Sequence, residues 1–236
     1  MLGSLAEAAD GSVITLLSVL ALGFFLGIRH ATDADHVVAV TTIVTRERTP
    51  RAAMAVGALW GVGHTLTILV VGGAIVVFGI VIPPKLGMSM EMSVAAMLIV
   101  LGLYNLTSAA TAIDRSAHAA LHAREHGEHE EHAPPGERWY ARLGVSGLRP
   151  IIVGIVHGLA GSAAVALLVL ATIRDVWSAL LYLLVFGVGT VAGMALLTTA
   201  MAVPMVAATR RFGSLEQLLR RVAGAASIAF GLFMIY

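Results

Sequence analysis

The chain has 236 residues, of which 58% are hydrophobic and 12% are charged, and its formal net charge is +1. This balance leaves too little polar surface for a compact water-soluble domain, and arginines confined to short stretches exclude a continuous nucleic-acid-binding face. The absence of cysteine excludes disulfides, thiolate metal ligands and cysteine redox relays.

Six stretches are long and apolar enough to cross a membrane, because the hydrocarbon core requires roughly 20 apolar residues. In chain order they are residues 12–44, 52–82, 92–113, 150–173, 176–208 and 218–236. The N-terminus lacks a basic region, so we expect the first stretch to be retained as a span and not cleaved. The sequence therefore predicts an all-α, polytopic integral membrane protein.

The first stretch is interrupted by polar residues at 29–36. A straight helix of its length would overshoot the bilayer at about 1.5 Å per residue. We therefore expect a break, a strong tilt or two segments near this polar patch.

The patch contains Arg29, His30, Asp33, Asp35 and His36. Ionisable groups at bilayer depth cost roughly 2.5 to 3.5 kcal/mol each on insertion scales, so such a cluster requires partners or a function. On a continuous helix His30, Asp33 and His36 follow a drifting stripe, whereas Asp35 would point elsewhere. Two imidazoles and a carboxylate favour nickel, cobalt, zinc or copper(II). The alternative is a structural Asp–His and Asp–Arg network at the membrane interface.

Two further histidines, His64 and His157, lie within apolar spans beside glycines that permit close helix approach. A lone histidine in a span is more often an interhelical hydrogen bonder than a ligand. Three spans that each contribute histidine favour a metal or proton path instead.

The segment 114–149 between the third and fourth spans is rich in histidine and glutamate. Its histidines recur at steps of three and four residues and are His118, His122, His126, His129 and His132. On a helix they would share one face, which indicates an accessory metal-collecting loop for a transition metal. The alternative is a solvated linker.

The two halves of the chain, 1–113 and 150–236, resemble each other at an offset of 126 to 129 residues. The matching tripeptides begin at Gly27 and Gly154, at Gly61 and Gly187, and at Gly102 and Gly231. Two repeats of three spans must run in opposite directions through the membrane, as in many secondary transporters. We therefore expect two inverted three-helix repeats joined by the histidine-rich loop.

The distribution of positive charge predicts the orientation of these spans. Twelve arginines lie in the connections after the first, third and fifth spans, whereas Lys85 and Arg174 lie on the opposite side. Because cytoplasmic loops retain positive charge, both termini should face outward and the histidine-rich loop should be cytoplasmic. Aromatic residues near predicted span ends fit an interfacial belt, namely Trp60, Trp139, Tyr140, Trp177 and Tyr182.

The residues from His30 to His36 form the pattern His-x4-Asp-His, which resembles the signature of the nickel/cobalt transporter family (the NiCoT/NicO superfamily). The Gly63-His64-Thr65 segment is similar to a second stretch of that family. The segment from His157 to Ser162 resembles its shorter, urease-associated branch. The resemblance implies a permease that recognises Ni²⁺ or Co²⁺ through His30, Asp33, Asp35 and His36, and through His64. The chain departs from classical members in having about six spans instead of eight, and Thr41-Thr42 instead of an aspartate-asparagine pair.

We therefore expect uptake of a divalent transition metal, most plausibly Ni²⁺ or Co²⁺, across a bacterial-type inner membrane. The predicted metal residues are His30, Asp33, Asp35, His36, His64 and His157. Efflux by the same site, or a non-metal permease or membrane scaffold, are the alternatives. No phosphate-binding loop, nucleophile elbow or acid/base pair is visible, so we expect no enzymatic activity and no tightly bound cofactor.

Overall fold

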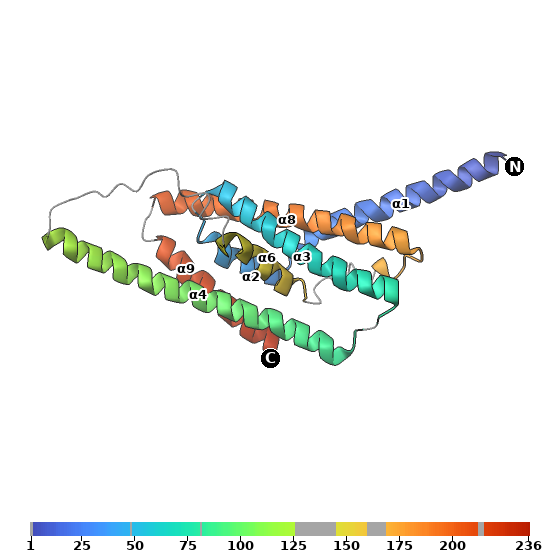
Figure 1. The fold of residues 1–236 in the computed structure, drawn as a ribbon. Coiled ribbons are helices and arrows are strands. Elements are labelled where there is room, and N and C mark those ends of the chain that lie inside the picture. Colours follow the sequence, from blue (N-terminus) through green and yellow to red (C-terminus); the bar gives the residue numbers. More distant parts are fainter. Residues whose placement is uncertain (1, 48, 81, 126–144, 160–168, 212–214) are drawn as a thin grey trace.

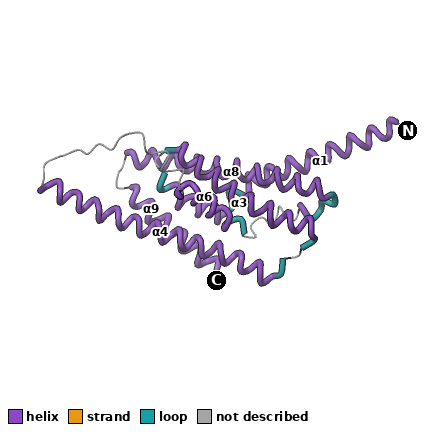
Figure 2. The backbone as a smooth tube through the Cα atoms, in the orientation of Figure 1, coloured by secondary structure: helices purple, strands orange, loops and turns teal. Residues whose placement is uncertain are grey.

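A computed structural model describes all but residues 1, 48, 81, 126–144, 160–168 and 212–214 (Figure 1). Within the described residues all regular structure is helical, and Figure 2 shows no strand there. The helices are α1 (Leu2–His30), α2 (Ala34–Val44), α3 (Pro50–Phe78), α4 (Pro84–Glu125), α6 (Val145–His157), α8 (Val176–Arg211) and α9 (Leu215–Ile235). The predicted all-α class is confirmed.

Four of these helices are long and apolar enough to cross a membrane, namely α3, α4, α8 and α9. A fifth span can be formed by α1 and α2 together, which meet at an angle of 55°. The apolar segment Leu148–His157 of α6 is shorter, and most of the rest of the predicted fourth span lies outside the described residues. The described residues thus form the helices of a polytopic membrane protein, with up to five spans of sufficient length and a shorter apolar helix, and the six predicted spans stay a prediction.

The break between α1 and α2 lies within the polar patch, as predicted. Helix α1 ends at His30. The Thr32 amide donates to the Arg29 carbonyl at 2.9 Å, and the Asp33 amide donates to the His30 carbonyl at 3.0 Å. Asp33 is extended and precedes the first turn of α2. A single membrane-spanning stretch therefore provides two differently directed segments.

Local signals fix the ends of α3. The Thr49 hydroxyl accepts a hydrogen bond from the Ala52 amide at 3.2 Å, and Pro50 occupies the first turn, where its missing N–H costs nothing. Gly79 ends the helix with φ of 61°, a left-handed conformation that favours glycine. These capping residues set both ends of α3, which begins two residues before the predicted span 52–82 and ends four residues before that span does.

The long helices α3 and α8 pack together at the centre of the bundle, where α1 lies along α8 and α6 lies along α3 (Figure 1). The pair α4 and α9 packs separately along one side. In Figure 1 the beginning of α1 and the end of α4 extend beyond the bundle.

Glycines allow these helices to approach closely. A Cβ at Gly27 of α1 would overlap the Phe186 carbonyl of α8, and a Cβ at Gly154 of α6 would overlap the Trp60 carbonyl of α3. Farther along, Gly193 lies against Ile28 and Ala31, so α1 and α8 run in the same direction. The corresponding contacts of α6 with α3 join Gly154 to Trp60 and Gly158 to Thr67, so these two also run in the same direction.

The helices α3 and α8 run in opposite directions, because Gly57 lies against Thr198 and Gly72 lies against Leu183. It follows that α1 and α6 are antiparallel to each other. The outer surface is strongly apolar, with Phe78 and Phe233 about three-quarters exposed, as a lipid-facing surface requires.

The aromatic-belt prediction is wrong for two residues. Trp60 and Tyr182 are fully buried, whereas Trp177 is exposed. Trp60 lies almost three turns into α3 because this helix begins at Pro50, and its indole packs beside histidines. The reason for the error is that a position near a span end does not decide whether a ring faces the membrane interface or a neighbouring helix.

Candidate metal site

Four histidines from four helices converge inside the bundle. His30 ends α1, His36 lies in the first turn of α2, His64 lies in the middle of α3, and His157 ends α6. All four are at most 5% exposed. The His36 ring is central, with centroid distances of 4.3 Å to His157, 4.6 Å to His30 and 5.0 Å to His64.

His30 connects the cluster to the more exposed Asp33. Its Nδ1 lies 2.9 Å from Asp33 Oδ2, and its Nε2 lies 3.0 Å from His64 Nε2. Because a carboxylate accepts hydrogen bonds, Nδ1 carries the proton, and the Nε2 of a neutral ring then presents its lone pair. Asp33 therefore fixes the His30 tautomer that can bind a cation through Nε2.

Asp35 joins the two halves of the chain. Its Oδ1 lies 3.1 Å from His36 Nδ1, and its Oδ2 lies 3.0 Å from His157 Nε2. Asp35 is only 7% exposed, so this carboxylate is held in the interior by two imidazoles. Removing either partner would leave a buried charge less well compensated.

Several buried nitrogens of the cluster lack a hydrogen-bond partner among the residues that the structure describes. They are His36 Nε2, His64 Nδ1, His157 Nδ1 and Trp60 Nε1. Buried polar groups are usually satisfied, and an unsatisfied one costs about 1 to 3 kcal/mol. An imidazole nitrogen without a proton can bind a metal ion, whereas the Trp60 indole nitrogen can only donate.

The ligand atoms form two sets that are compact enough to hold an ion. One set is His30, His36 and His64, and the other is Asp35, His36 and His157. Within each set the ligand atoms lie within 4.8 Å of one another. Buried imidazole with carboxylate suits nickel, cobalt, zinc or copper(II) better than magnesium or calcium.

The structure brings five of the six predicted residues into one buried cluster, and places Asp33 at its edge with 31% side-chain exposure. The expectation that Asp35 points elsewhere is wrong. It assumed one continuous helix, but the chain turns at residues 31–33 and redirects Asp35 towards His157.

Trp60 and Phe186 were not predicted to contact the cluster. The Trp60 ring lies 5.6 Å from the His36 ring and 5.2 Å from the His157 ring, and the Phe186 ring lies 5.5 Å from the His30 ring. A helical spacing of four residues between Trp60 and His64 was the available signal, since residues at this spacing share a face.

A second polar region lies where α2 ends. Arg46 donates from Nε to Asn105 Oδ1 at 2.6 Å, and its guanidinium lies 3.8 Å from the Tyr104 ring centroid. Asn105 in turn donates to the Thr42 carbonyl at 2.8 Å. Partial burial lowers the pKa of Arg46, and the interaction with Tyr104 acts in the opposite direction. An arginine nevertheless keeps its charge at neutral pH. These bonds tie the end of α2 to α4.

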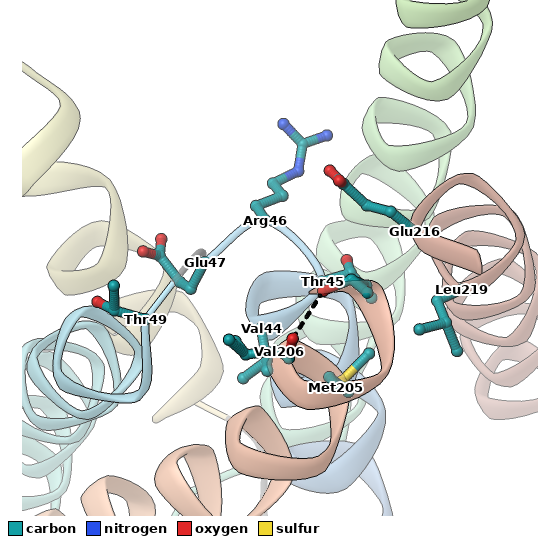
Figure 3. A pocket seen from close by; sticks show the side chains of 10 residues that line it. Val44, Thr45, Arg46, Glu47, Thr49, Met205, Val206, Glu216 and Leu219 are labelled. Carbon is teal, nitrogen blue, oxygen red and sulfur yellow. Dashed lines mark hydrogen bonds between the residues drawn. The ribbon is translucent and has the colours of Figure 1, made fainter. Parts of the chain in front are cut away.

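A cavity of about 430 Å³ opens beside Arg46. Figure 3 shows the carboxylates of Glu47 and Glu216 on opposite sides of it, with Arg46 between them. Its floor is formed by Val44, Val206 and Met205. The cavity therefore combines a charged rim with an apolar floor.

The histidine-rich loop is largely outside the described residues. The residues that the structure does not describe include His126, His129 and His132. The backbone of His118 and His122 belongs to α4. The prediction that this loop collects metal remains a prediction.

Comparison with known proteins identifies relatives over most of the chain. Residues 16–215 match the family NicO, which is described as a high-affinity nickel-transport protein. The urease accessory protein UreH of Bacillus sp. (strain TB-90) is 36% identical over 223 residues, which are 94% of this chain and 92% of the relative. No solved structure matches the chain.

Proposed function

The chain belongs to the NicO family of nickel-transport proteins, as its sequence motifs indicated, and on that premise we propose that it carries Ni²⁺ or Co²⁺ through the buried histidine cluster. Transport and not catalysis is the function that this family implies, with the divalent ion as substrate and the membrane as the surrounding solvent. The assembly of these residues into one transport site is our proposal.

The observation that carries the proposal is the convergence of four imidazoles and one carboxylate inside an apolar bundle. All five residues are at most 7% exposed, and they come from four helices. Assembling so many ionisable groups at bilayer depth is costly, which is why such groups usually mark an ion or proton path. Imidazole nitrogen replaces part of the water that a divalent transition metal loses on entering the membrane.

We assign different roles to the two aspartates. Asp33 is the more exposed, and its carboxylate accepts a hydrogen bond from Nδ1 of His30, so it orients that ring. Asp35 lies between His36 and His157, where its oxygens can bind the ion or orient both rings. A carboxylate in this position also offsets the charge of a divalent cation.

The halves 1–113 and 150–236 form an inverted pair in our proposal. Reciprocal glycine contacts support it, because Gly27 meets Phe186 as Gly154 meets Trp60, at an offset of 126 to 127 residues. The antiparallel relation of α1 and α6 supports it as well. Inverted pairs commonly hold a substrate between the halves and rock around it.

We further propose that the connection containing Arg46 and the loop 114–149 face the cytoplasm of a bacterial-type cell, with both termini outside. The excess of arginine in these connections supports this orientation. Uptake is the proposed direction, because a relative named as an enzyme's accessory protein fits delivery of the metal into the cell. The loop histidines would then collect metal on the cytoplasmic side.

The test is ⁶³Ni²⁺ flux into proteoliposomes, with Co²⁺, Zn²⁺ and Mg²⁺ as competitors. We expect His36→Ala to abolish flux, and the matched control Thr198→Ala to retain it. Thr198 is equally buried, but its hydroxyl donates to carbonyls of its own helix, those of Met194 and Ala195.

Wild-type flux no greater than that of empty liposomes, with folded protein confirmed, would reject metal transport in favour of a non-metal permease or scaffold. Metal depletion of cells that express the protein would establish efflux instead of uptake.

A further inference from the structure

We infer that the cluster holds two overlapping metal positions that share His36, between which the ion moves, and not one site with all ligands bound at once. The first position is formed by His30, His36 and His64, and the second by Asp35, His36 and His157. This inference rests on the proposed transport function, which it extends by specifying how the ion is passed on.

The first position has the geometry of a nitrogen site. The Nε2 atoms of His30 and His64 lie 3.0 Å apart. Two nitrogens that bind one ion at about 2.0 to 2.1 Å lie at roughly this separation when the angle between them is near 90°. The same contact is a hydrogen bond between the two rings, which an ion bound to both nitrogens would replace.

The second position differs in both chemistry and origin. It combines one carboxylate with two imidazoles, and His157 comes from the second half of the chain. The 3.0 Å contact of Asp35 with His157 and the 3.1 Å contact of Asp35 with His36 bring its ligand atoms together. An ion in this position would replace these hydrogen bonds, and would bind to both halves at once.

The distances separate the two positions. Among the described residues, no compact set of ligand atoms combines His157 with either His30 or His64. The rings of His64 and His157 are 5.8 Å apart, the longest of the centroid distances given for the cluster. In this arrangement of the helices, the ligand atoms of His157 are therefore not grouped around one ion with those of His30 or His64.

His36 can serve both positions because its two nitrogens differ. Its Nδ1 contacts Asp35 of the second position, whereas its buried Nε2 has no partner among the described residues and is available to the first. Two divalent ions bridged by one imidazole would repel each other strongly in a medium of low dielectric. The positions are therefore occupied one at a time.

Sharing one ligand solves a problem of transport. An ion held by all the imidazoles at once would leave slowly, because binding must be weak or divided among sites for release. In moving from the first position to the second, the ion exchanges the nitrogens of His30 and His64 for one nitrogen of His157 and one oxygen of Asp35, and it passes from Nε2 to Nδ1 of the same His36 ring. Because His36 lies in the first turn of the short helix α2, a small rotation of that helix moves the shared ligand.

The test uses the full chain, purified without a histidine tag, in which the five loop histidines 118, 122, 126, 129 and 132 are replaced by glutamine. This background removes metal binding that would obscure the buried cluster. Co²⁺ serves as the probe, its stoichiometry is measured by titration, and X-ray absorption counts the imidazole ligands. His64→Ala and His157→Ala each remove one position, and His36→Ala removes both.

We expect one ion per chain, with two or three imidazole ligands. His157→Ala should still bind one ion, with three imidazoles, and His64→Ala should bind one ion through two imidazoles and a carboxylate. Both variants should lose at least about 100-fold in flux while retaining binding. His36→Ala should weaken binding at least 100-fold.

Four imidazoles on one ion in the background protein, falling to three in either variant, would overturn the inference and establish a single site. Two ions bound together would overturn it as well. These outcomes are read from binding alone, so they are distinct from an absence of flux, which would reject the transport proposal.

Discussion

The crossing of α1 with α8 and the crossing of α6 with α3 share the same packing but differ in chemistry. At the first, Gly27 lies against the Phe186 carbonyl and the Thr190 amide. At the second, Gly154 lies against the Trp60 carbonyl and the His64 amide. The helix that carries the glycine ends in a histidine in both cases, at His30 and His157.

The ring contacts are repeated as well, because His30 packs near Phe186 and His157 packs near Trp60. The crossings differ one helical turn farther along, four residues after Phe186 and Trp60. At this position α8 carries Thr190 and α3 carries His64. The Thr190 hydroxyl bonds a carbonyl of its own helix, whereas His64 contacts His30 across the bundle. The comparison teaches that the backbone contacts and the histidine at the end of each glycine-bearing helix are duplicated, while His64 of α3 has no histidine counterpart in α8.

The largest effect should be a loss of folding, caused by breaking the helix packing at either crossing. Gly27→Leu or Gly154→Leu would drive a side chain into a neighbouring backbone, which cannot be relieved by changing a rotamer. We expect loss of the folded, monodisperse protein in size-exclusion chromatography for both. Gly87→Leu is the control, because a Cβ there meets nothing within 4 Å. Normal folding of either crossing variant would show that the close approach is not required.

The second effect should separate the residues that differ between the crossings. His64→Ala should reduce ⁶³Ni²⁺ flux at least about 100-fold, because it removes a proposed ligand and not a residue that only orients one. Thr190→Ala should change flux less than about threefold, because a hydroxyl bonded to its own helix contributes little. Equal losses in the two variants would mean that the crossings are functionally alike.

A smaller effect is expected at the edge of the cluster. Asp33→Asn keeps the shape of the side chain but weakens its hydrogen bond to the His30 ring, so metal affinity should fall about 10-fold. Titration with Co²⁺ in the background without loop histidines measures this change. A loss as large as that of His36→Ala would instead make Asp33 a direct ligand.

The smallest effect on flux should come from changing the histidine-rich loop that connects the two halves. Replacing the five loop histidines by glutamine should lower flux by only a few-fold at limiting metal, because flexible histidines raise the local metal concentration without forming the path. At saturating metal the difference should vanish. Complete loss of flux in liposomes would place the loop in the transport path.

Much of the fold could be predicted from the sequence because the membrane imposes a strong constraint. Spans need long apolar helices, and the polar patch at 29–36 marked the break that the structure places at residues 31–33. The fourth span was less well predicted, since α6 ends at His157. The belt prediction failed at Trp60 and Tyr182 because hydropathy places span ends without knowing which side chains face a neighbouring helix.

The sequence by itself determined the helical class, the family and the residue types available for binding metal, because these follow from local composition and spacing. Only the tertiary structure decided which residues meet. Asp35 and His157 are separated by 122 positions, and their contact depends on the turn after α1 and on the glycine-mediated approach of α6 to α3. Helical periodicity carries no information on such pairs, because it describes one helix at a time and the grouping of ligands is a property of several helices packed together.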